Sequence, residues 1–570
     1  MRYLLAIARD GAPSPADLSA RTGLHPVPSP PPLIVLTDQP ARAIALGSVG
    51  IALGHLFPRY GPARPLDALS EVEGAAIAAA RGSAIAAIWG GYVIALTGAD
   101  GVRVLRDPSG ALPCYYARSG HGTVFASDVD LLIAAGTAAR VIDWAALGRQ
   151  LYRAGLPTRE TAIAGVRELL PGFALDVGMP DPDQCPIWSP WDYASPADTA
   201  PEDTAERLAR TVRHCVRSWT APYPRRLLSV SGGLDSSVVA ASLGDGETLC
   251  LTMYGSDPAG DERPYARALC DHLDLTLVER AYRVEDVDLD VAPGAHLPRP
   301  VGRSQTVAYE RAHLDLAATR GIDAFVTGNG GDNVFGYSQS AAAIVDRFRQ
   351  EDAGLGVART IGDVCRQTSC GPFRAIRAAW SIARSPPGYR WRSNPLLLGQ
   401  ACVATAEHAP LSHPWLDTPP GAFPGKARHI AGLLFVQQHL EPGRSRYAPV
   451  LHPLLSQPIV EACLAIPSWA WRAGGIDRAV VRQAFAGDLP EMVARRTTKG
   501  GPDGFSARLI AHHHAGIRAR LLDGALAAHG VADRGAIDAV LADTDSLSGE
   551  QRARILELVA AEAWVGAWQA

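Results

Sequence analysis

Lysine is nearly absent from this sequence: of its 54 basic residues only Lys426 and Lys499 are lysines. Because 58 acidic residues bring the formal net charge to −4, there is no global positive field to hold a nucleic-acid backbone. No apolar run approaches the roughly 20 residues that a membrane-spanning helix needs. The nine cysteines form no CxxC pair, and the N-terminus carries no cleavage-type segment. We therefore expect a cytoplasmic protein with reduced thiols that binds neither nucleic acid nor membrane.

The hydrophobic pattern changes part of the way along the 570 residues. Short strand-like segments separated by turns fill the first part, where the clearest helical pattern is at 143–154. The predicted strands are 3–8, 33–36, 84–96 with an interruption at Trp89-Gly90-Gly91, 102–106, 115–117 and 124–126. We therefore predict a β-rich, layered domain over residues 1–180.

Residues 181–203 are rich in proline and acidic side chains, and we expect them to form an interdomain linker. Strand and helix patterns alternate after this segment. The predicted strands are 226–230, 248–254 and 324–327, and the predicted helices are 205–218, 236–243 and 263–272. Such alternation is typical of a parallel, doubly wound sheet, so residues 204–570 are predicted to form an α/β domain.

The strongest motif is Ser231-Gly232-Gly233-Leu234-Asp235-Ser236-Ser237, which joins a predicted strand to a predicted helix. Two adjacent glycines let the backbone close around an anion, and amides at the start of the helix point toward it. The serine hydroxyls add hydrogen-bond donors. Because the lysine of a kinase-type P-loop is missing, the motif predicts a different kind of pyrophosphate cradle. The alternative is an ordinary strand-turn-helix without a ligand.

A second glycine-rich loop, Gly328-Asn329-Gly330-Gly331-Asp332-Asn333, follows the predicted strand 324–327. Ligands of open α/β sheets bind outside the carboxyl ends of the strands, so both loops should face one crevice. Asp235 and Asp332 would then lie beside one polyphosphate, and a shared Mg2+ would relieve their repulsion. The alternative for Asp332 is a turn or N-cap role.

Lys499 lies in an arginine- and glycine-rich loop. A lysine in such a loop could bring a compact positive charge to a phosphate or to an anionic transition state. The alternative is a solvated surface residue.

These motifs resemble those of the asparagine synthetase superfamily of ATP-pyrophosphatases, whose members adenylate a carboxylate. Arg106–Tyr116 and Phe125–Asp128 are similar to the glutaminase-like N-terminal domain of that family. Pro453–Leu455, Val460-Glu461 and Ile466-Pro467 are similar to its C-terminal segment. The resemblance implies an Ntn-hydrolase-like layered domain followed by a doubly wound, adenine nucleotide alpha hydrolase-like domain.

Two departures narrow this resemblance. A working glutaminase of this kind needs a cysteine at position 2, where this sequence has Arg2, so we expect the first domain to lack that reaction. In the second glycine-rich loop, asparagine synthetases have a glutamate and β-lactam synthetases a tyrosine, whereas this sequence has Asn329. Together with residues 453–458, 474–479 and 498–500, the loop most resembles the lasso-peptide macrolactam synthetases, or lasso cyclases.

That resemblance implies that ATP and Mg2+ are used to adenylate an Asp or Glu side chain of a leader-free core peptide. The N-terminal amine of the peptide, whose ordinary pKa is ~7.7–8.0, would then attack with release of AMP. A cognate leader peptidase would be the natural partner. A β-lactam-type or ammonia-dependent asparagine synthetase remains an alternative, as does a non-catalytic nucleotide-binding scaffold.

The resemblance also implies roles for individual residues. The expected nucleotide contacts are Val230, Met253 (or Tyr254 in its register) and Gly328, and the expected pyrophosphate contacts are Ser231, Gly232, Gly233, Asp235 and Ser236. The expected Mg2+ ligands are Asp235 and Asp332. Lys499 is expected to stabilise the adenylation transition state.

Overall fold

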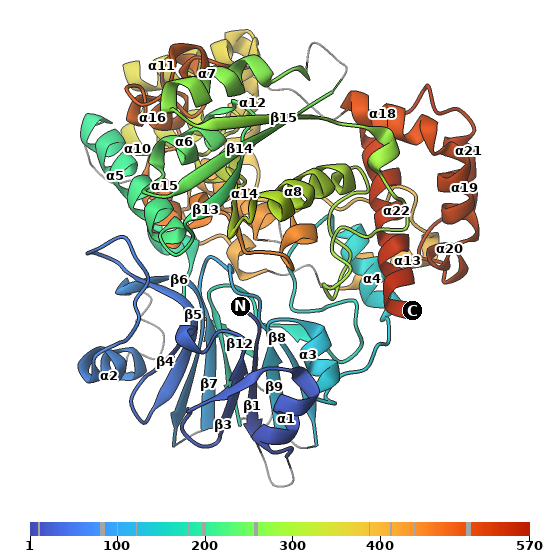
Figure 1. Ribbon diagram of the computed structural model, residues 1–570. Helices are drawn as coiled ribbons and strands as arrows, with labels where there is room; N and C mark the ends of the chain where they lie inside the picture. The colour runs from blue at the N-terminus through green and yellow to red at the C-terminus, as the bar shows by residue number, and fades with distance from the viewer. Residues whose placement is uncertain are drawn as a thin grey trace.

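A computed structural model shows that the chain forms two domains (Figure 1). The structure describes residues 1–8, 12–79, 86–99, 101–120, 122–178, 183–195, 201–255, 260–386, 388–410, 413–437, 441–497 and 503–570. The N-terminal part contains two antiparallel six-stranded sheets, and the C-terminal part contains a parallel five-stranded sheet. The predicted combination of a β-rich and an α/β domain is confirmed. Among the described helices, none has both the length and the apolar character needed to cross a bilayer.

The two N-terminal sheets pack face to face. The first contains, in spatial order, β10 (Arg167–Glu168), β8 (Tyr115–Ser119), β9 (Gly122–Ala126), β1 (Tyr3–Ala8), β3 (Leu33–Thr37) and β2 (His25–Val27). The second contains β12 (Gln184–Pro186), β11 (Phe173–Val177), β7 (Gly101–Arg106), β6 (Ile88–Gly98), β5 (Gly50–Pro58) and β4 (Ala43–Ala45). Alternate residues of β1, Tyr3 and Leu5, point between the sheets and share a core with Leu53 and Val93 of the second sheet.

Helices cover the outer faces of this pair of sheets. The first sheet is covered by α1 (Pro15–Thr22), α3 (Val129–Ala134) and α4 (Trp144–Tyr152), and the second by α2 (Glu71–Ala79). Leu4 of β1 therefore shares a core with Leu131 and Leu147, while Ile77 packs on the opposite side of the domain. The first domain is thus layered in the order helix, sheet, sheet, helix.

Strand β6 corrects one prediction. It continues through Trp89-Gly90-Gly91, where the sequence predicted an interruption, and Gly90 and Gly91 pair with Leu56 and His55 of β5. Gly90 has a φ of 142°, which glycine adopts without strain. The glycines therefore keep the strand paired where the sequence pattern suggested a break. The predicted first residues of this strand, up to 85, lie outside the described residues.

The described part of segment 181–203 contacts both domains. It contains β12, which extends the second sheet, and a 3-10 turn, η3 (Pro190–Tyr193). Trp188 Nε1 donates a hydrogen bond to Glu461 Oε1 over 3.0 Å, and Trp191 Nε1 donates to the Trp415 carbonyl over 3.0 Å. These two indoles attach the segment to the C-terminal domain.

The C-terminal sheet is parallel and carries helices on both faces. Its spatial order is β15 (Thr276–Ala281), β14 (Glu247–Tyr254), β13 (Arg225–Ser229), β16 (Ala324–Val326) and β17 (Val450–Leu451). One face packs on α5 (Pro201–Thr220), α6 (Leu234–Ser242) and α7 (Arg263–Leu273), and the other on α8 (Thr306–Arg320). The predicted doubly wound sheet is therefore confirmed.

Helices form most of the remaining chain. They are α9 (Gly331–Val334), α10 (Ala342–Glu351), α11 (Leu355–Thr368), α12 (Pro372–Arg384), α13 (Gln400–His408), α14 (Pro424–Val436), α15 (Gln457–Ala465), α16 (Ala479–Ala484), α17 (Glu491–Ala494), α18 (Asp503–His512), α19 (His514–Asp523), α20 (Ala525–Ala528), α21 (Arg534–Leu541) and α22 (Gly549–Gln569). Leu556 and Trp564 of α22 belong to the same apolar core as Leu147 of α4. This shared core holds the two domains together.

Candidate functional site

The two glycine-rich loops of the C-terminal domain lie side by side. β13 and β16 pair in parallel, with Leu228 opposite Val326, so both strands end at the same edge of the sheet. A side chain at Gly328 would place its Cβ 2.5 Å from the Ser236 nitrogen, and one at Gly331 would overlap the Asp235 carboxyl group. Glycine is therefore required at both positions for the loops to approach this closely.

The first loop forms a concave turn at the start of α6. Gly232 has a φ of 60°, a left-handed conformation that strains other residues. The Gly233 amide donates to Ser231 Oγ over 3.3 Å, and Ser236 Oγ donates to the Gly233 carbonyl over 3.3 Å. No side chain caps the first turn of α6. The amides of that turn, at the positive end of the helix dipole, are thus suited to an anion such as pyrophosphate.

The residues expected around the nucleotide lie at neighbouring strand ends. The Val230 amide, just after β13, donates to the Leu251 carbonyl of β14 over 2.9 Å. Met253 is half-buried near the end of β14, and the next residue, Tyr254, lies beneath the Arg263 guanidinium at 3.9 Å. Ser237, by contrast, is fully buried and donates to the Gly233 carbonyl over 2.8 Å, so its hydroxyl stabilises the first turn of α6.

An arginine that the sequence reasoning missed lies between the two aspartates. Arg478 Nη1 is 3.0 Å from Asp235 Oδ1 and 2.6 Å from Asp332 Oδ1, and Arg478 Nη2 is 2.7 Å from Asp477 Oδ2. Burial by itself would lower the pKa of Arg478, but these three carboxylates raise it above its ordinary value. Arg478 belongs to the 474–479 segment that carries the lasso-cyclase resemblance. Nothing in the sequence of this segment indicates which carboxylates contact the Arg478 guanidinium.

The two aspartates also fit a cation that arrives with a nucleotide. Both carboxylates contact a single nitrogen atom of Arg478, so one cation can contact both. Mg2+ in nucleotide enzymes is commonly held by one or two carboxylates, with phosphate oxygens and water completing the octahedron. Within the described ranges there is no cluster of three or more His, Cys, Asp or Glu that could hold a metal. Asp235 and Asp332 therefore suit a Mg2+ that also binds the phosphates.

Lys499 lies outside the described residues, but the chain leading to it is anchored at the cradle. Arg496 Nη1 donates to the Ser231 carbonyl over 3.0 Å, and Arg496 Nη2 pairs with Glu262 at 2.8 Å. The Arg496 guanidinium also lies over the Tyr265 ring, 4.0 Å from its centre. The described chain is therefore held at the cradle through Arg496, three residues before Lys499 in the sequence.

Asn329 is hydrogen-bonded to a second group of residues that the sequence did not indicate. Asn329 Nδ2 donates to Glu441 Oε1 over 2.7 Å, and Glu441 is paired with the fully buried Arg444. Arg444 Nη1 also lies 3.5 Å from Glu310 Oε1. Burial raises the pKa of Glu310 to about 7, and the Arg444 charge opposes this shift. A carboxylate thus lies one hydrogen bond behind the loop where relatives place a glutamate or a tyrosine.

Helix α14 supports the loop that carries Asp332. His429 Nε2 contacts the Val334 carbonyl at 2.9 Å, and Asn333 Nδ2 donates to the Gly432 carbonyl over 2.8 Å. Burial, together with the nearby Lys426 charge, lowers the pKa of His429 to about 4. The imidazole is therefore neutral at neutral pH.

Acid is expected to destabilise the protein through His429. A histidine whose folded pKa lies below its unfolded value of about 6.5 gains its proton on unfolding, so its contribution to stability is complete above that pH and lost as the pH falls toward about 4. In urea unfolding, the free energy of unfolding of the wild type should fall by about 2 kcal/mol more than that of His429→Gln between about pH 7 and pH 5. His408→Gln, which alters an exposed histidine, should lose as much as the wild type.

Gly331→Ala is expected to weaken Mg2+-dependent ATP binding by roughly tenfold or more, because the methyl group would displace the Asp235 carboxylate. Gly354→Ala is a matched control, since a Cβ at the start of α11 meets nothing within 4 Å. Titration calorimetry with ATP and Mg2+ measures both affinities. Equal affinities for the two variants would contradict the close approach of the loops.

A comparison with known protein families matches this chain to the asparagine synthase family over residues 205–433 and 447–566, which is more than half of the chain. The match includes the parallel sheet, both glycine-rich loops and Arg478. A search of curated proteins found no match.

Proposed function

The chain belongs to the asparagine synthase family, and from this premise we propose that it is a lasso-peptide macrolactam synthetase. Members of the family form amide bonds with the energy of ATP, and the chain is an ATP-dependent carbon-nitrogen ligase. In the proposed reaction, an Asp or Glu side-chain carboxylate of a leader-free core peptide attacks the α-phosphorus of ATP, and pyrophosphate leaves. The N-terminal amine of the same peptide then attacks the acyl carbon and loses a proton. AMP leaves as the ring closes.

The observation that carries the proposal is Asn329 in the loop 328–333. Its side-chain amide donates to Glu441 and cannot accept a proton from an incoming amine. An α-amine with a pKa of ~7.7–8.0 is partly neutral near neutral pH, so its attack needs no dedicated strong base. When one peptide carries both the amine and the activated carboxyl, bringing them together supplies much of the rate. These features favour a peptide's own N-terminus as the nucleophile.

Each group of residues at the site would have its own role in adenylation. The loop 231–236 would hold the pyrophosphate through backbone amides, and the strand ends at Val230, Met253 and Gly328 would contact the nucleotide. Asp235 and Asp332 would hold Mg2+, which when bound neutralises phosphate charge. Lys499 would stabilise the negative charge that develops during transfer. Before the nucleotide binds, the positive charge of Arg478 would offset the repulsion between the Asp235 and Asp332 carboxylates.

We also propose that the first domain lacks glutaminase activity. Arg2 occupies the position of the cysteine nucleophile, and its Nε and Nη2 donate to Asp128 over 3.1 and 3.0 Å. Cys114 is fully buried, and burial raises its pKa to about 12, which leaves no thiolate for attack. The proposal requires that glutamine is not hydrolysed by the purified protein.

The test is incubation of the purified protein with ATP, Mg2+ and the leader-free core peptide of a precursor encoded beside its gene. We expect a protease-resistant peptide that has lost water, with AMP released in equal amount. Release of AMP without loss of water from the peptide would overturn the proposal. Amide formation on a small amino acid, with the core peptide inert, would favour a β-lactam-type or asparagine-type synthetase instead.

A further inference from the structure

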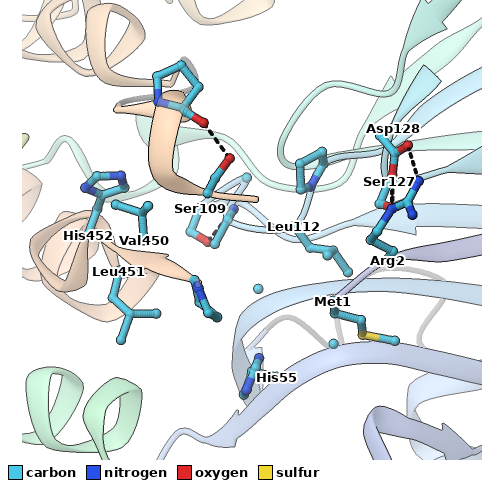
Figure 2. A pocket seen from close by; sticks show the side chains of 18 of the residues that line it. Met1, Arg2, His55, Ser109, Leu112, Ser127, Asp128, Val450, Leu451 and His452 are labelled. Atoms are coloured by element: carbon cyan, nitrogen blue, oxygen red, sulfur yellow. Dashed lines mark hydrogen bonds and ion pairs between the residues drawn. The ribbon is translucent and has the colours of Figure 1, made fainter. Parts of the chain in front are cut away.

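A large chamber lies between the two domains, apart from the crevice that holds Asp235 and Asp332. Its volume is about 720 Å3, within the range of about 300–1,000 Å3 typical of sites that enclose a ligand. Figure 2 shows Met1, Arg2 and His55 of the first domain on one side and Val450 and His452 of the second domain on the other. Both domains are thus needed to form this space.

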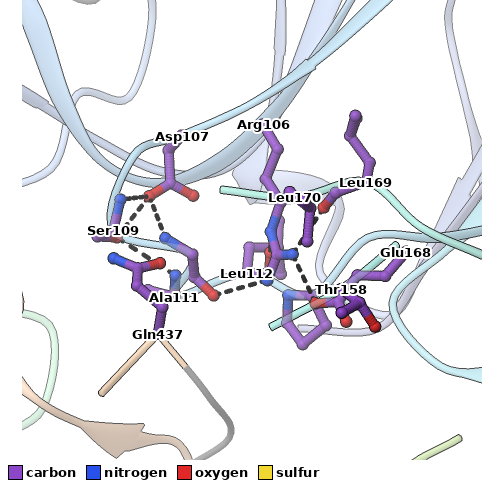
Figure 3. A network of polar contacts seen from close by, with 12 residues as sticks. Arg106, Asp107, Ser109, Ala111, Leu112, Thr158, Glu168, Leu169, Leu170 and Gln437 are labelled. Carbon is purple, nitrogen blue, oxygen red and sulfur yellow. Dashed lines mark hydrogen bonds and ion pairs between the residues drawn. The ribbon is translucent and has the colours of Figure 1, made fainter. Parts of the chain in front are cut away.

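The wall contributed by the first domain is rigid before any ligand binds. Arg106, only 2% exposed, donates to the carbonyls of Leu112 and Leu169 over 2.8 Å and pairs with Glu168 at 2.8 Å (Figure 3). Asp107 accepts hydrogen bonds from the amides of residues 109 and 110 over 2.8 and 2.9 Å. Because these buried polar groups satisfy one another, the loop 106–113 is held in one shape. The chamber is therefore preformed.

Charged side chains gather at the exposed rim of the chamber. Arg2 pairs with Asp128 at 3.0 Å, and Arg446 of the second domain pairs with Asp130 of the first at 2.5 Å. The deeper lining is buried and mostly uncharged: it includes Gly54, Gly91, Leu112, Trp219, Leu455 and Ser456. The chamber thus changes from a charged entrance to an interior in which uncharged side chains surround the paired Arg106 and Glu168.

Besides the paired Arg106 and Glu168, neutral hydrogen-bonding groups line the interior. Burial lowers the pKa of His55 to about 3 and that of His296 to about 4, so both imidazoles are uncharged at neutral pH. Gln437 Nε2 donates to the Pro108 carbonyl over 3.2 Å, but Gln437 Oε1 is buried without a hydrogen-bond donor among the described residues. The Gln437 side chain is thus held against the loop 106–113 at the wall of the chamber.

The chamber lies directly behind the loop that carries Asp332. His452 lines the chamber, and its Nδ1 lies 2.7 Å from Thr327 Oγ1, one residue before the loop. Leu455 also lines the chamber and packs against Gly330. A single layer of side chains therefore separates the chamber from the loop.

We propose that this chamber binds a segment of the peptide substrate outside the two groups that react. The inference deepens the proposed function and rests on it. The N–H and C=O groups of an uncharged peptide match the neutral polar lining, and its apolar side chains match Leu112, Trp219 and Leu455. A free zwitterionic amino acid such as glutamine would need charged partners for both of its ends, and Arg106 and Glu168 already pair with each other.

The test is photo-crosslinking in the full-length protein. Tyr447, which lines the chamber, is replaced by p-benzoylphenylalanine, and the matched control carries the same group at Tyr60, which is 87% exposed outside the chamber. The probe is a pool of linear peptides with a free α-amine and one internal aspartate. We expect crosslinking at position 447, little at position 60, and no competition by excess glutamine. Equal crosslinking at both positions, or none at 447, would overturn the inference.

A second variant separates this inference from the proposed function. Ser445→Trp would fill the entrance with a large ring and is expected to raise the KM of the core peptide by about tenfold, with the KM of ATP unchanged. Ser381→Trp, which places the same ring on an exposed position of α12 outside the chamber, is the matched control and should leave both KM values unchanged. If the wild type cyclises the peptide and Ser445→Trp keeps its KM, the chamber inference alone fails. If the wild type cyclises nothing, the proposed function fails, and the crosslinking still decides whether the chamber holds peptide.

Discussion

Asp332→Asn is expected to slow adenylation by about 1,000-fold, equivalent to about 4 kcal/mol of transition-state stabilisation. The substitution keeps the size of the side chain but removes a charge that, with Asp235, contacts a single nitrogen atom of Arg478 and is proposed to hold Mg2+. The loop should keep its shape, because the amides of Val334 and Phe335 bond to backbone carbonyls. Pyrophosphate exchange into ATP measures the rate, and titration calorimetry measures Mg2+-dependent ATP binding.

Asp323→Asn is the matched control for this prediction. Asp323 precedes β16, whereas Asp332 follows it, and Asp323 pairs with Arg225 at 3.0 Å at the opposite edge of the sheet. Removing its charge should leave both measurements unchanged. An Asp332→Asn enzyme that stays within tenfold of the wild type would show that this carboxylate does not hold the cation.

Lys499→Met is expected to slow adenylation by about 100- to 1,000-fold while ATP binding changes little. The reason is that a positive charge beside the adenylyl group during its transfer stabilises the transition state more than it stabilises bound ATP. Arg495→Met removes a neighbouring charge that is 81% exposed and paired with Glu491, and it should have no effect. Single-turnover release of AMP separates the chemical step from binding. An unchanged rate in Lys499→Met would make Lys499 an ordinary solvated residue.

The scarcity of lysine provides an independent test of the same role. The chain's other lysine, Lys426, is 1% exposed, and its Nζ bonds to the carbonyls of Leu464 and Ile466. An amine-reactive reagent should therefore modify Lys499 well before Lys426 and inactivate the enzyme, and ATP with Mg2+ should protect it. Mass spectrometry of the modified chain identifies the lysine. Inactivation without modification of Lys499 would contradict its proposed role.

The sequence by itself determined the features that depend on local conformation. Gly232 with its positive φ, the helix that follows it and the loop after β16 were all recognisable, because a tight turn at a strand end needs particular residues at fixed spacing. The family match over 205–433 and 447–566 agrees with the superfamily that these motifs resemble. The alternation of strands and helices also predicted the doubly wound sheet correctly.

Only the tertiary structure decided the features that depend on distant partners. The continuous pairing of β6 at Gly90 depends on β5, so the local glycine pattern pointed to a break that does not occur. Arg478 reaches Asp235 and Asp332 across 243 and 146 residues of sequence, and Asn329 reaches Glu441 across 112. The interdomain chamber needs walls from both domains. Hydrophobic periodicity records which face of an element is buried, but not which side chain it meets there, and these contacts appear only when the chain is folded.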